Sequence, residues 1–202
     1  MNNYSRRNIL KNIAIGGAAA LAAPQALAQR PASGQPPIRF AVSTYSYWHF
    51  EKVKYPIEKV IENASRLGFD GVEILRRQRE SEEKPYMNKL KRMAFDAGLA
   101  LPMLSIHQSF VKPDAEARAK DIAHTVKCIQ LAVQLGIPCI RMNTGSWGTG
   151  RSAPDYYKTG KETPLPGYTD EDAINWCIEG MKECLKHAPQ EGARLPTEND
   201  SG

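Results

Sequence analysis

The sequence lacks an apolar run long enough to cross a bilayer as a mature helix. The Ala- and Gly-rich run Ile13–Ala23 is shorter than the roughly 20 apolar residues that a spanning helix needs. Cysteine is also scarce, and none of Cys128, Cys139, Cys177 and Cys184 forms a CxxC pair. All four fall in helix or strand patterns, so we expect buried free thiols rather than disulfides.

Acidic residues are absent from the first 28 positions, whereas Arg6 and Arg7 stand ahead of the apolar run. Ala26–Ala28 then has the small-x-small form of a cleavage site. These features predict a twin-arginine signal peptide over residues 1–28 and a mature start at Gln29, with export to the periplasm or the extracellular space. An uncleaved membrane anchor is the alternative, and after cleavage no stable anchor is expected.

Dense clusters of Lys and Arg are lacking beyond the signal. The formal net charge is +5, and it falls to +2 when residues 1–28 are removed, because they carry three basic residues and no acidic one. Lys89, Lys91 and Arg92 are expected to form a solvated helix face. A nucleic-acid partner is therefore not expected.

What the chain does contain is a repeated joint, in which a helical pattern ends in Gly and a short apolar run follows at once. Gly favours the left-handed position just past a helix C-terminus, and an apolar run without alternation suits a strand buried on both faces. The joint therefore predicts an α/β fold with a parallel sheet and with chemistry at the strand ends. Its four copies lie at 67–75, 97–104, 135–142 and 191–195.

Apolar periodicity predicts five strands and four helices after a linker at residues 29–37. Asp114 and the pair Thr169 and Asp172 are expected to cap the last two helices at their N-termini. The expected strands are 38–43, 71–75, 99–106, 138–142 and a fifth from 193 onward. The expected helices are 56–67, 85–97, 115–135 and 170–188.

Each helix is expected to bury one apolar stripe. These stripes include Leu67, Val133, Ile174, Ile178 and Leu185. Between the fourth strand and the last helix, residues 145–168 show no sustained periodicity. A loop of this length inside a compact domain is usually functional or disordered.

The phrases FDGVEIL, LPMLSIHQSF, IRMNTG and TENDSG occur in this order, spaced along the predicted strands. Together they resemble the sugar phosphate isomerase/epimerase family, which has the xylose-isomerase-like TIM barrel. The resemblance covers residues 38–202 and implies a (β/α)8 barrel that is incomplete, with about five of its eight units present. A full barrel takes about 250 residues. A C-terminal truncation is therefore expected, and Arg194 and Pro196 are expected to interrupt the fifth strand.

The same resemblance implies a divalent metal, such as Mn, Mg, Co or Zn, held at strand ends by carboxylates and a histidine. Of those ligands, Glu198 matches the family's position here and is the candidate for metal ligand and for acid/base, whereas Asp200 stands where the family has His. The implied reaction is proton transfer at the carbon alpha to a carbonyl of a carbohydrate, with the metal stabilising the enediolate oxygens. A lyase acting on an oxidised sugar is a variant of this chemistry.

Two further candidates stand where predicted strands end. Glu73 lies in an apolar run, where a carboxylate is costly to bury unless it contacts substrate or metal, or forms an ion pair with Arg76 or Arg141. His107 follows the third strand and is a candidate catalytic proton carrier, ligand or donor to a sugar hydroxyl. A structural histidine is the alternative.

Substrate contacts are expected from four other residues. Asn143 ends the fourth strand and suits sugar recognition. Trp48 and His49 follow the first strand, and Trp147 follows the fourth, so that their rings could stack on a sugar. Packing of these aromatic residues beneath loops is the alternative.

Three functions remain open at this level. The first is a carbohydrate isomerase or epimerase, and export favours a free sugar or glycoside over a phosphorylated substrate. An abasic-site endonuclease shares the barrel, but it would have a His where this chain has Asn143. A non-catalytic barrel fragment, or one that self-associates through its open sheet edges, is the third.

Overall fold

The computed structural model describes residues 38–48, 50–150, 160–188 and 191–198. The described residues from 39 onward belong to one compact unit. The predicted signal peptide and linker therefore lie outside the described residues, as do His49, Asn199 and Asp200. None of the described helices combines the length and the apolarity needed to traverse a bilayer.

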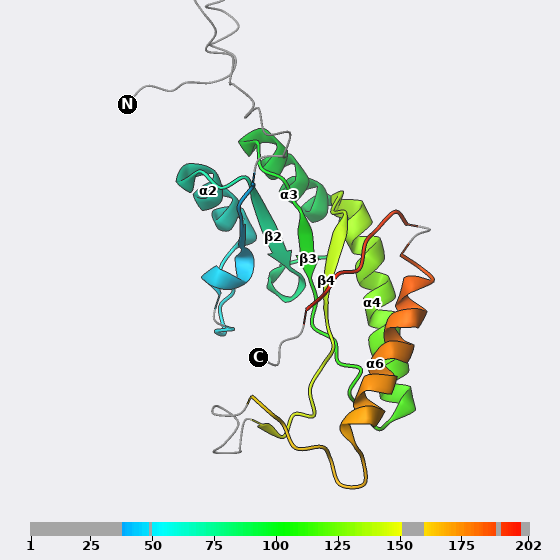
Figure 1. The fold of residues 1–202 in the computed structure, drawn as a ribbon. Helices are drawn as coiled ribbons and strands as arrows, with labels where there is room; N and C mark the ends of the chain where they lie inside the picture. The colour runs from blue at the N-terminus through cyan, green and yellow to red at the C-terminus, as the bar shows by residue number, and fades with distance from the viewer. Residues whose placement is uncertain (1–37, 49, 151–159, 189–190, 199–202) are drawn as a thin grey trace, which may run out of the picture. The chain divides into compact units, whose positions relative to one another are not determined.

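Five parallel strands form one sheet, and their order in the sheet is their order in the chain (Figure 1). This arrangement is that of a TIM barrel in which five strands are present, and it confirms the predicted fold class. The register pairs Ser43 with Glu73, and Asn143 with Glu198. The strands are β1 (Ala41–Ser43), β2 (Gly71–Leu75), β3 (Met103–Ser105), β4 (Cys139–Asn143) and β5 (Thr197–Glu198).

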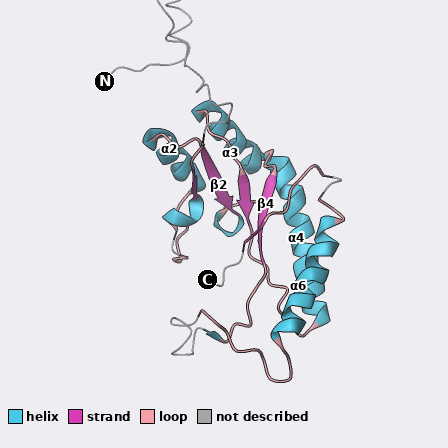
Figure 2. Ribbon diagram, in the orientation of Figure 1, coloured by secondary structure: helices cyan, strands magenta, loops and turns pink. Residues whose placement is uncertain are grey.

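Among the described residues, four α-helices alternate with these strands, and Figure 2 distinguishes helices from strands by colour. They are α2 (Ile57–Leu67), α3 (Lys84–Ala97), α4 (Ala115–Leu135) and α6 (Asp170–Leu185). Two short 3-10 helices, η1 (Thr44–Tyr47) and η2 (Arg76–Gln78), follow β1 and β2.

The predicted Gly joints end the first three α-helices. Gly68, Gly98 and Gly136 have φ values of 82°, 72° and 70°, and the N–H of each donates to carbonyls of the preceding turn. The left-handed backbone is favourable for Gly because it has no Cβ to clash. The predicted N-caps are also confirmed: Asp114 accepts from the backbone of α4, and Thr169 forms a capping box with the third residue of α6.

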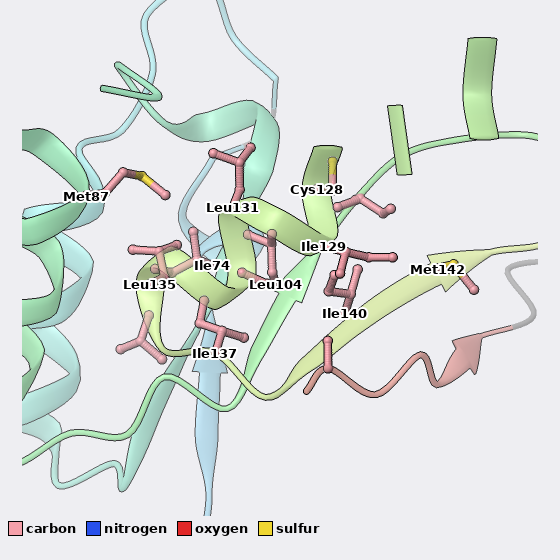
Figure 3. Packing of buried hydrophobic residues seen from close by; sticks show 14 of the residues in the cluster. Ile74, Met87, Leu104, Cys128, Ile129, Leu131, Leu135, Ile137, Ile140 and Met142 are labelled. Atoms are coloured by element: carbon pink, nitrogen blue, oxygen red, sulfur yellow. The ribbon is translucent and has the colours of Figure 1, made fainter. Parts of the chain in front are cut away.

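The core lies between the sheet and its covering helices (Figure 3). Ile74, Leu104 and Ile140 occupy one register row of β2, β3 and β4, and none of them is exposed. Ile129 and Leu135 of α4 belong to the same cluster. Each such side chain contributes about 1.5–3 kcal/mol when it is fully buried. The helices are therefore held on the sheet mainly by apolar packing.

Two strands are shorter than predicted. The first begins at Ala41 and ends at Ser43. Directly after it, the hydroxyl of Thr44 accepts a hydrogen bond from the Leu75 N–H at 2.8 Å, in the place of a backbone carbonyl. The third begins at Met103, because Pro102 has no N–H to donate to the ladder.

The predicted apolar stripe of α6 is wrong at three of its positions. Its buried residues are small, namely Ala173, Cys177, Gly180 and Cys184, whereas Ile174, Ile178 and Leu185 are exposed. The small residues allow α6 to pack closely on its neighbours, so the larger apolar side chains are turned out of that contact.

Leu67 and Val133 were also expected to be buried, and both are exposed. Leu67 is the last residue of α2, and the chain turns away at Gly68 directly after it. On α4, Cys128, Ile129 and Ala132 lie on the buried side instead of Val133. As predicted, all four cysteines are free, and every one except Cys139 is buried.

The interruption expected from Arg194 and Pro196 is only partial. The Arg194 carbonyl accepts from the Ile140 N–H at 2.9 Å, and the Pro196 carbonyl accepts from the Met142 N–H at 3.2 Å. Proline removes a donor but keeps its acceptor. The segment therefore stays in register with β4, although β5 itself has only two residues.

Candidate functional site

An open cavity of about 1660 Å³ lies at the carboxyl ends of the strands. In a barrel of this kind, side chains at this end come from several strands and meet in one site. Ser43 and Asn143 line it from the last positions of β1 and β4, and His107 and Gln108 from just beyond β3. Glu73 and Arg141 line it from two residues before the ends of β2 and β4. The structure therefore brings four predicted site residues to one cavity: Glu73, His107, Asn143 and Trp147.

Glu73 is held by its neighbours on β3 and β4. The Ser105 hydroxyl donates to Glu73 Oε1, and Arg141 Nε lies 3.2 Å from both Glu73 Oε1 and Ser105 Oγ. Of the two predicted ion-pair partners, Arg141 is therefore the one found. Removing one member of a mostly buried pair leaves an uncompensated charge, so this triad fixes the Glu73 carboxylate in place.

Ser105 was not identified from the sequence, although it is completely buried between the two charges. Its role follows from the register, which places Ser105 beside Arg141. That register links β3 to β4 and cannot be read from either strand alone.

His107 lies on the cavity wall beside an aromatic group. Its ring meets the Phe50 ring edge-on, with centroids 6.0 Å apart, and Phe50 lies 4.8 Å from Trp48. Phe50 has a φ of 58°, a left-handed conformation that is uncommon for a bulky residue. Trp48 is buried, donates from its indole to the Glu51 carbonyl, and is not among the residues that line the cavity.

The loops after β3 and β4 are tied together at the cavity wall. Gln108 Nε2 donates to the Asn143 carbonyl at 2.6 Å, and the Phe110 N–H donates to the Thr144 carbonyl at 3.3 Å. Gln108, which the sequence did not single out, is 6% exposed.

Trp147, another predicted site residue, also lines the cavity. Its indole donates to Asp170 Oδ1 at 3.1 Å, and its ring meets that of Trp176 at 5.9 Å. In the loop that follows, Glu162 accepts from the N–H groups of Gly148 and Gly150. These bonds fix the described part of the long loop, whereas residues 151–159 lie outside the described residues.

The segment after β2 is held by a charged cluster centred on Glu82. This carboxylate contacts Arg76, Arg79 and Lys127, and the Arg79 side chain is only 2% exposed. Burial raises the pKa of Glu82, but the hydrogen bond from Lys127 and the charges of the three cations outweigh it and lower the pKa to about 2. The cluster anchors the segment that carries Arg77 to the cavity wall.

The strand order and the site at the strand ends agree with a comparison against known families. Residues 61–202 match the family model described as xylose isomerase-like TIM barrel. The chain belongs to the xylose isomerase-like TIM barrel family. This membership confirms the xylose isomerase-like barrel that the sequence phrases predicted.

Solved structures of the same fold include three sugar epimerase or isomerase proteins. A D-psicose 3-epimerase from Clostridium cellulolyticum H10, solved with D-tagatose, is 19% identical, with a TM-score of 0.58 over 78% of this chain and 51% of that one. A 3-keto-D-glucoside 4-epimerase from E. coli is 12% identical, with a TM-score of 0.57 over 80% and 56%. A sugar phosphate isomerase/epimerase from Parabacteroides distasonis is 15% identical, with a TM-score of 0.53 over 83% and 53%.

This chain spans about half the length of these structures, and at such low identities the likeness shows the fold alone. No curated protein sequence gives a significant match.

In this xylose isomerase-like barrel, the predicted metal ligand Glu198 pairs in register with Asn143. Within the part of the chain that the structure describes, no group of three His, Cys, Asp or Glu side chains is arranged to hold a metal ion. Glu73 is engaged by Arg141 and Ser105. The described residues therefore do not fit a complete divalent-metal site on their own.

Proposed function

We propose that this protein is a carbohydrate isomerase or epimerase that transfers a proton at the carbon next to a carbonyl. The observation that carries the proposal is the convergence of Glu73, His107 and Asn143 at the strand ends of a xylose isomerase-like barrel. The solved structures of this fold that are named for 3- and 4-epimerases of keto sugars add support.

In this proposal His107 and Glu198 are the two groups that exchange the proton. Removal of the alpha proton leaves an enediolate, and the proton returns either to the other face of the same carbon or to the neighbouring carbon. The first outcome is an epimerisation and the second an isomerisation. Asn143 and Trp147 would hold the hydroxyls and the ring, while the Glu73–Arg141 pair supplies a fixed polar wall without net charge.

Metal dependence is part of the proposal, with Mn, Mg, Co or Zn as the candidate ions and Glu198 as one ligand. The remaining ligands would have to come from outside the described residues. Isothermal titration of the full chain with each ion tests this point, and a failure to bind any of them above background would remove the metal from the proposal.

The proton transfer is tested by isotope exchange. The full chain is incubated with D-fructose or D-tagatose in D2O, with and without each metal, and deuterium at the carbon alpha to the carbonyl is measured by NMR. We expect exchange in the native protein and at least a hundredfold loss in His107→Asn. His187→Asn is the matched control, because His187 does not line the cavity. The absence of exchange with every sugar and metal would refute the proposal.

Self-association is a second candidate property. Within the described sheet, β1 and β5 each pair on one side only, and such edges favour pairing with another chain. Sedimentation velocity over a range of concentrations tests it, and a monodisperse monomer throughout would rule it out.

We further propose that the protein is exported through its twin-arginine signal. Replacing Arg6 and Arg7 by Lys should leave the protein in the cytoplasmic fraction of the host cell. Equal periplasmic yields of the native protein and this variant would contradict export by this route.

A further inference from the structure

One wall of the cavity carries three buried polar atoms that the protein leaves uncompensated. Gln108 Oε1, Ser109 Oγ and Asn143 Oδ1 have no hydrogen-bond partner in the part of the chain that the structure describes, and all three residues line the cavity. Buried polar groups in native proteins are nearly always paired, with protein or with ordered water. The exceptions are therefore places to look for a ligand. We call Gln108, Ser109 and Asn143 the amide wall.

The orientation of the Gln108 amide is fixed by its other end. Gln108 Nε2 donates to the Asn143 carbonyl at 2.6 Å, so Oε1 is the end that remains to accept a hydrogen bond. The side chain is 6% exposed, and water has little access to it. The same contact holds the side chain of Gln108 against the end of β4, which carries Asn143.

A glycine lies directly against Ser109 of the amide wall. Gly145 has a φ of 104°, and a Cβ added there would stand 2.2 Å from Ser109 Oγ. Any other residue at this position would strain the backbone and displace the Ser109 hydroxyl. The loops after β3 and β4 are thus brought together so closely that only a glycine fits between them.

The chemistry of the three atoms selects what can bind. Amide oxygens only accept hydrogen bonds, whereas the Ser109 hydroxyl can both donate and accept. A ligand that completes the wall must therefore bring donors, as adjacent sugar hydroxyls do. Phosphate and carboxylate oxygens only accept hydrogen bonds. Such a group at the wall would leave the amide oxygens unpaired, and its own lone pairs would face the lone pairs of the amide oxygens.

The charges around the cavity give no advantage to an anion. The described lining residues include four acidic and four basic side chains, so the lining has no net charge when histidine is neutral. Among these side chains, Lys112 is paired with Asp121 and Arg141 is paired with Glu73.

We infer that the amide wall is a binding subsite for two adjacent hydroxyls of an uncharged carbohydrate, and that it favours neutral sugars over their phosphate esters. The inference rests on the proposed function for the assignment of the ligand as a carbohydrate. Binding at the wall does not require turnover, so it can be measured separately from the reaction.

The test is calorimetric titration of the full chain with D-fructose, D-tagatose and D-fructose 6-phosphate. Gln108→Met removes the acceptor at nearly constant volume and should weaken binding of the neutral sugar about tenfold or more. Ser109→Ala, which changes little else, should weaken it about threefold or more and serves as the second variant if Gln108→Met does not fold.

Gln78→Met is a matched control. Gln78 is also buried, donates from Nε2 to the Tyr55 carbonyl at 2.7 Å, and has an Oε1 without a partner in the described residues, but it does not line the cavity. Its replacement should alter thermal stability and leave sugar binding within about twofold of the native value.

Three results would overturn the inference. The first is tighter binding of the phosphate ester than of the free sugar, and the second is no binding of either neutral sugar. The third is equal sugar binding by the native protein, Gln108→Met and Ser109→Ala; this third result would mean that the wall holds water only. The isotope-exchange assay separates the two proposals. Selective binding of the neutral sugars without deuterium exchange would refute the proposed reaction but support the subsite. Deuterium exchange that neither Gln108→Met nor Ser109→Ala changes would support the reaction but refute the subsite.

Discussion

Gly180 lies in the middle of α6, directly against the Phe110 ring, and replacing it by Ala tests how closely the two are packed. A Cβ at position 180 would stand 2.6 Å from the nearest ring carbon of Phe110. Ordinary carbon contacts are about 3.5–4.0 Å, so the ring would have to move by about 1 Å. Phe110 has no exposed surface, so the ring cannot move without displacing other buried groups.

Two opposing effects decide the sign of the change. Ala in place of Gly stabilises a helix interior by about 0.5–1 kcal/mol. Overpacking of a closed core costs about 1–3 kcal/mol. We therefore expect Gly180→Ala to lower the free energy of unfolding by about 1 kcal/mol, against the direction of helix propensity.

Urea unfolding followed by circular dichroism measures this difference. Glu179→Ala, at the exposed neighbouring position, should change stability by less than about 0.5 kcal/mol. Phe110→Leu combined with Gly180→Ala should recover part of the loss, because the smaller side chain makes room. If Gly180→Ala is as stable as the native protein or more so, the close approach of α6 to Phe110 is refuted.

Three further predictions concern charge, thiols and a helix cap. The pKa of Glu82 is lowered to about 2 from 4.5, so the stability that its charge contributes is present above pH 4.5 and is lost as the pH falls towards 2. Glu82→Gln should therefore lower the free energy of unfolding by about 1–2 kcal/mol at pH 7. The same variant should make stability less dependent on pH between 4.5 and 2. Burial raises the pKa of Cys128 and Cys184 to about 11, so at pH 8 both should react with iodoacetamide about 100-fold more slowly in the native protein than in urea, and equal rates would contradict the buried placement. Thr169→Ala removes the capping box of α6 and should cost about 1 kcal/mol by thermal unfolding, whereas Thr169→Asn should cost much less.

Local chemistry was enough to predict the elements and the strand-end candidates. Gly68, Gly98 and Gly136 were recognisable because a left-handed residue after a helix is a local requirement. Glu73 and Asn143 were recognisable because the ends of parallel strands meet at one edge of a sheet, whatever their separation in the sequence.

Residues whose roles depend on contacts between elements could not be predicted. Ser105 and Gln108 matter because of the register of β3 with β4, which neither segment shows alone. The stripe of α6 failed for a related reason. The spacing of Ile174 and Ile178 reveals an apolar face, but the face that becomes buried is decided by where Gly180 can approach Phe110.

The coincidence of strand order with chain order bears on how the protein folds. Every strand pairs with the strand that precedes or follows it in the chain, so each pairing closes a loop of one helix and its connections rather than a long stretch of sequence. Each pairing still joins residues 30 to 55 positions apart, and parallel pairing of this kind forms slowly because the loop must close first. The sheet can grow from β1 towards β5 one unit at a time as the chain leaves the ribosome, and each new strand finds its partner already in place.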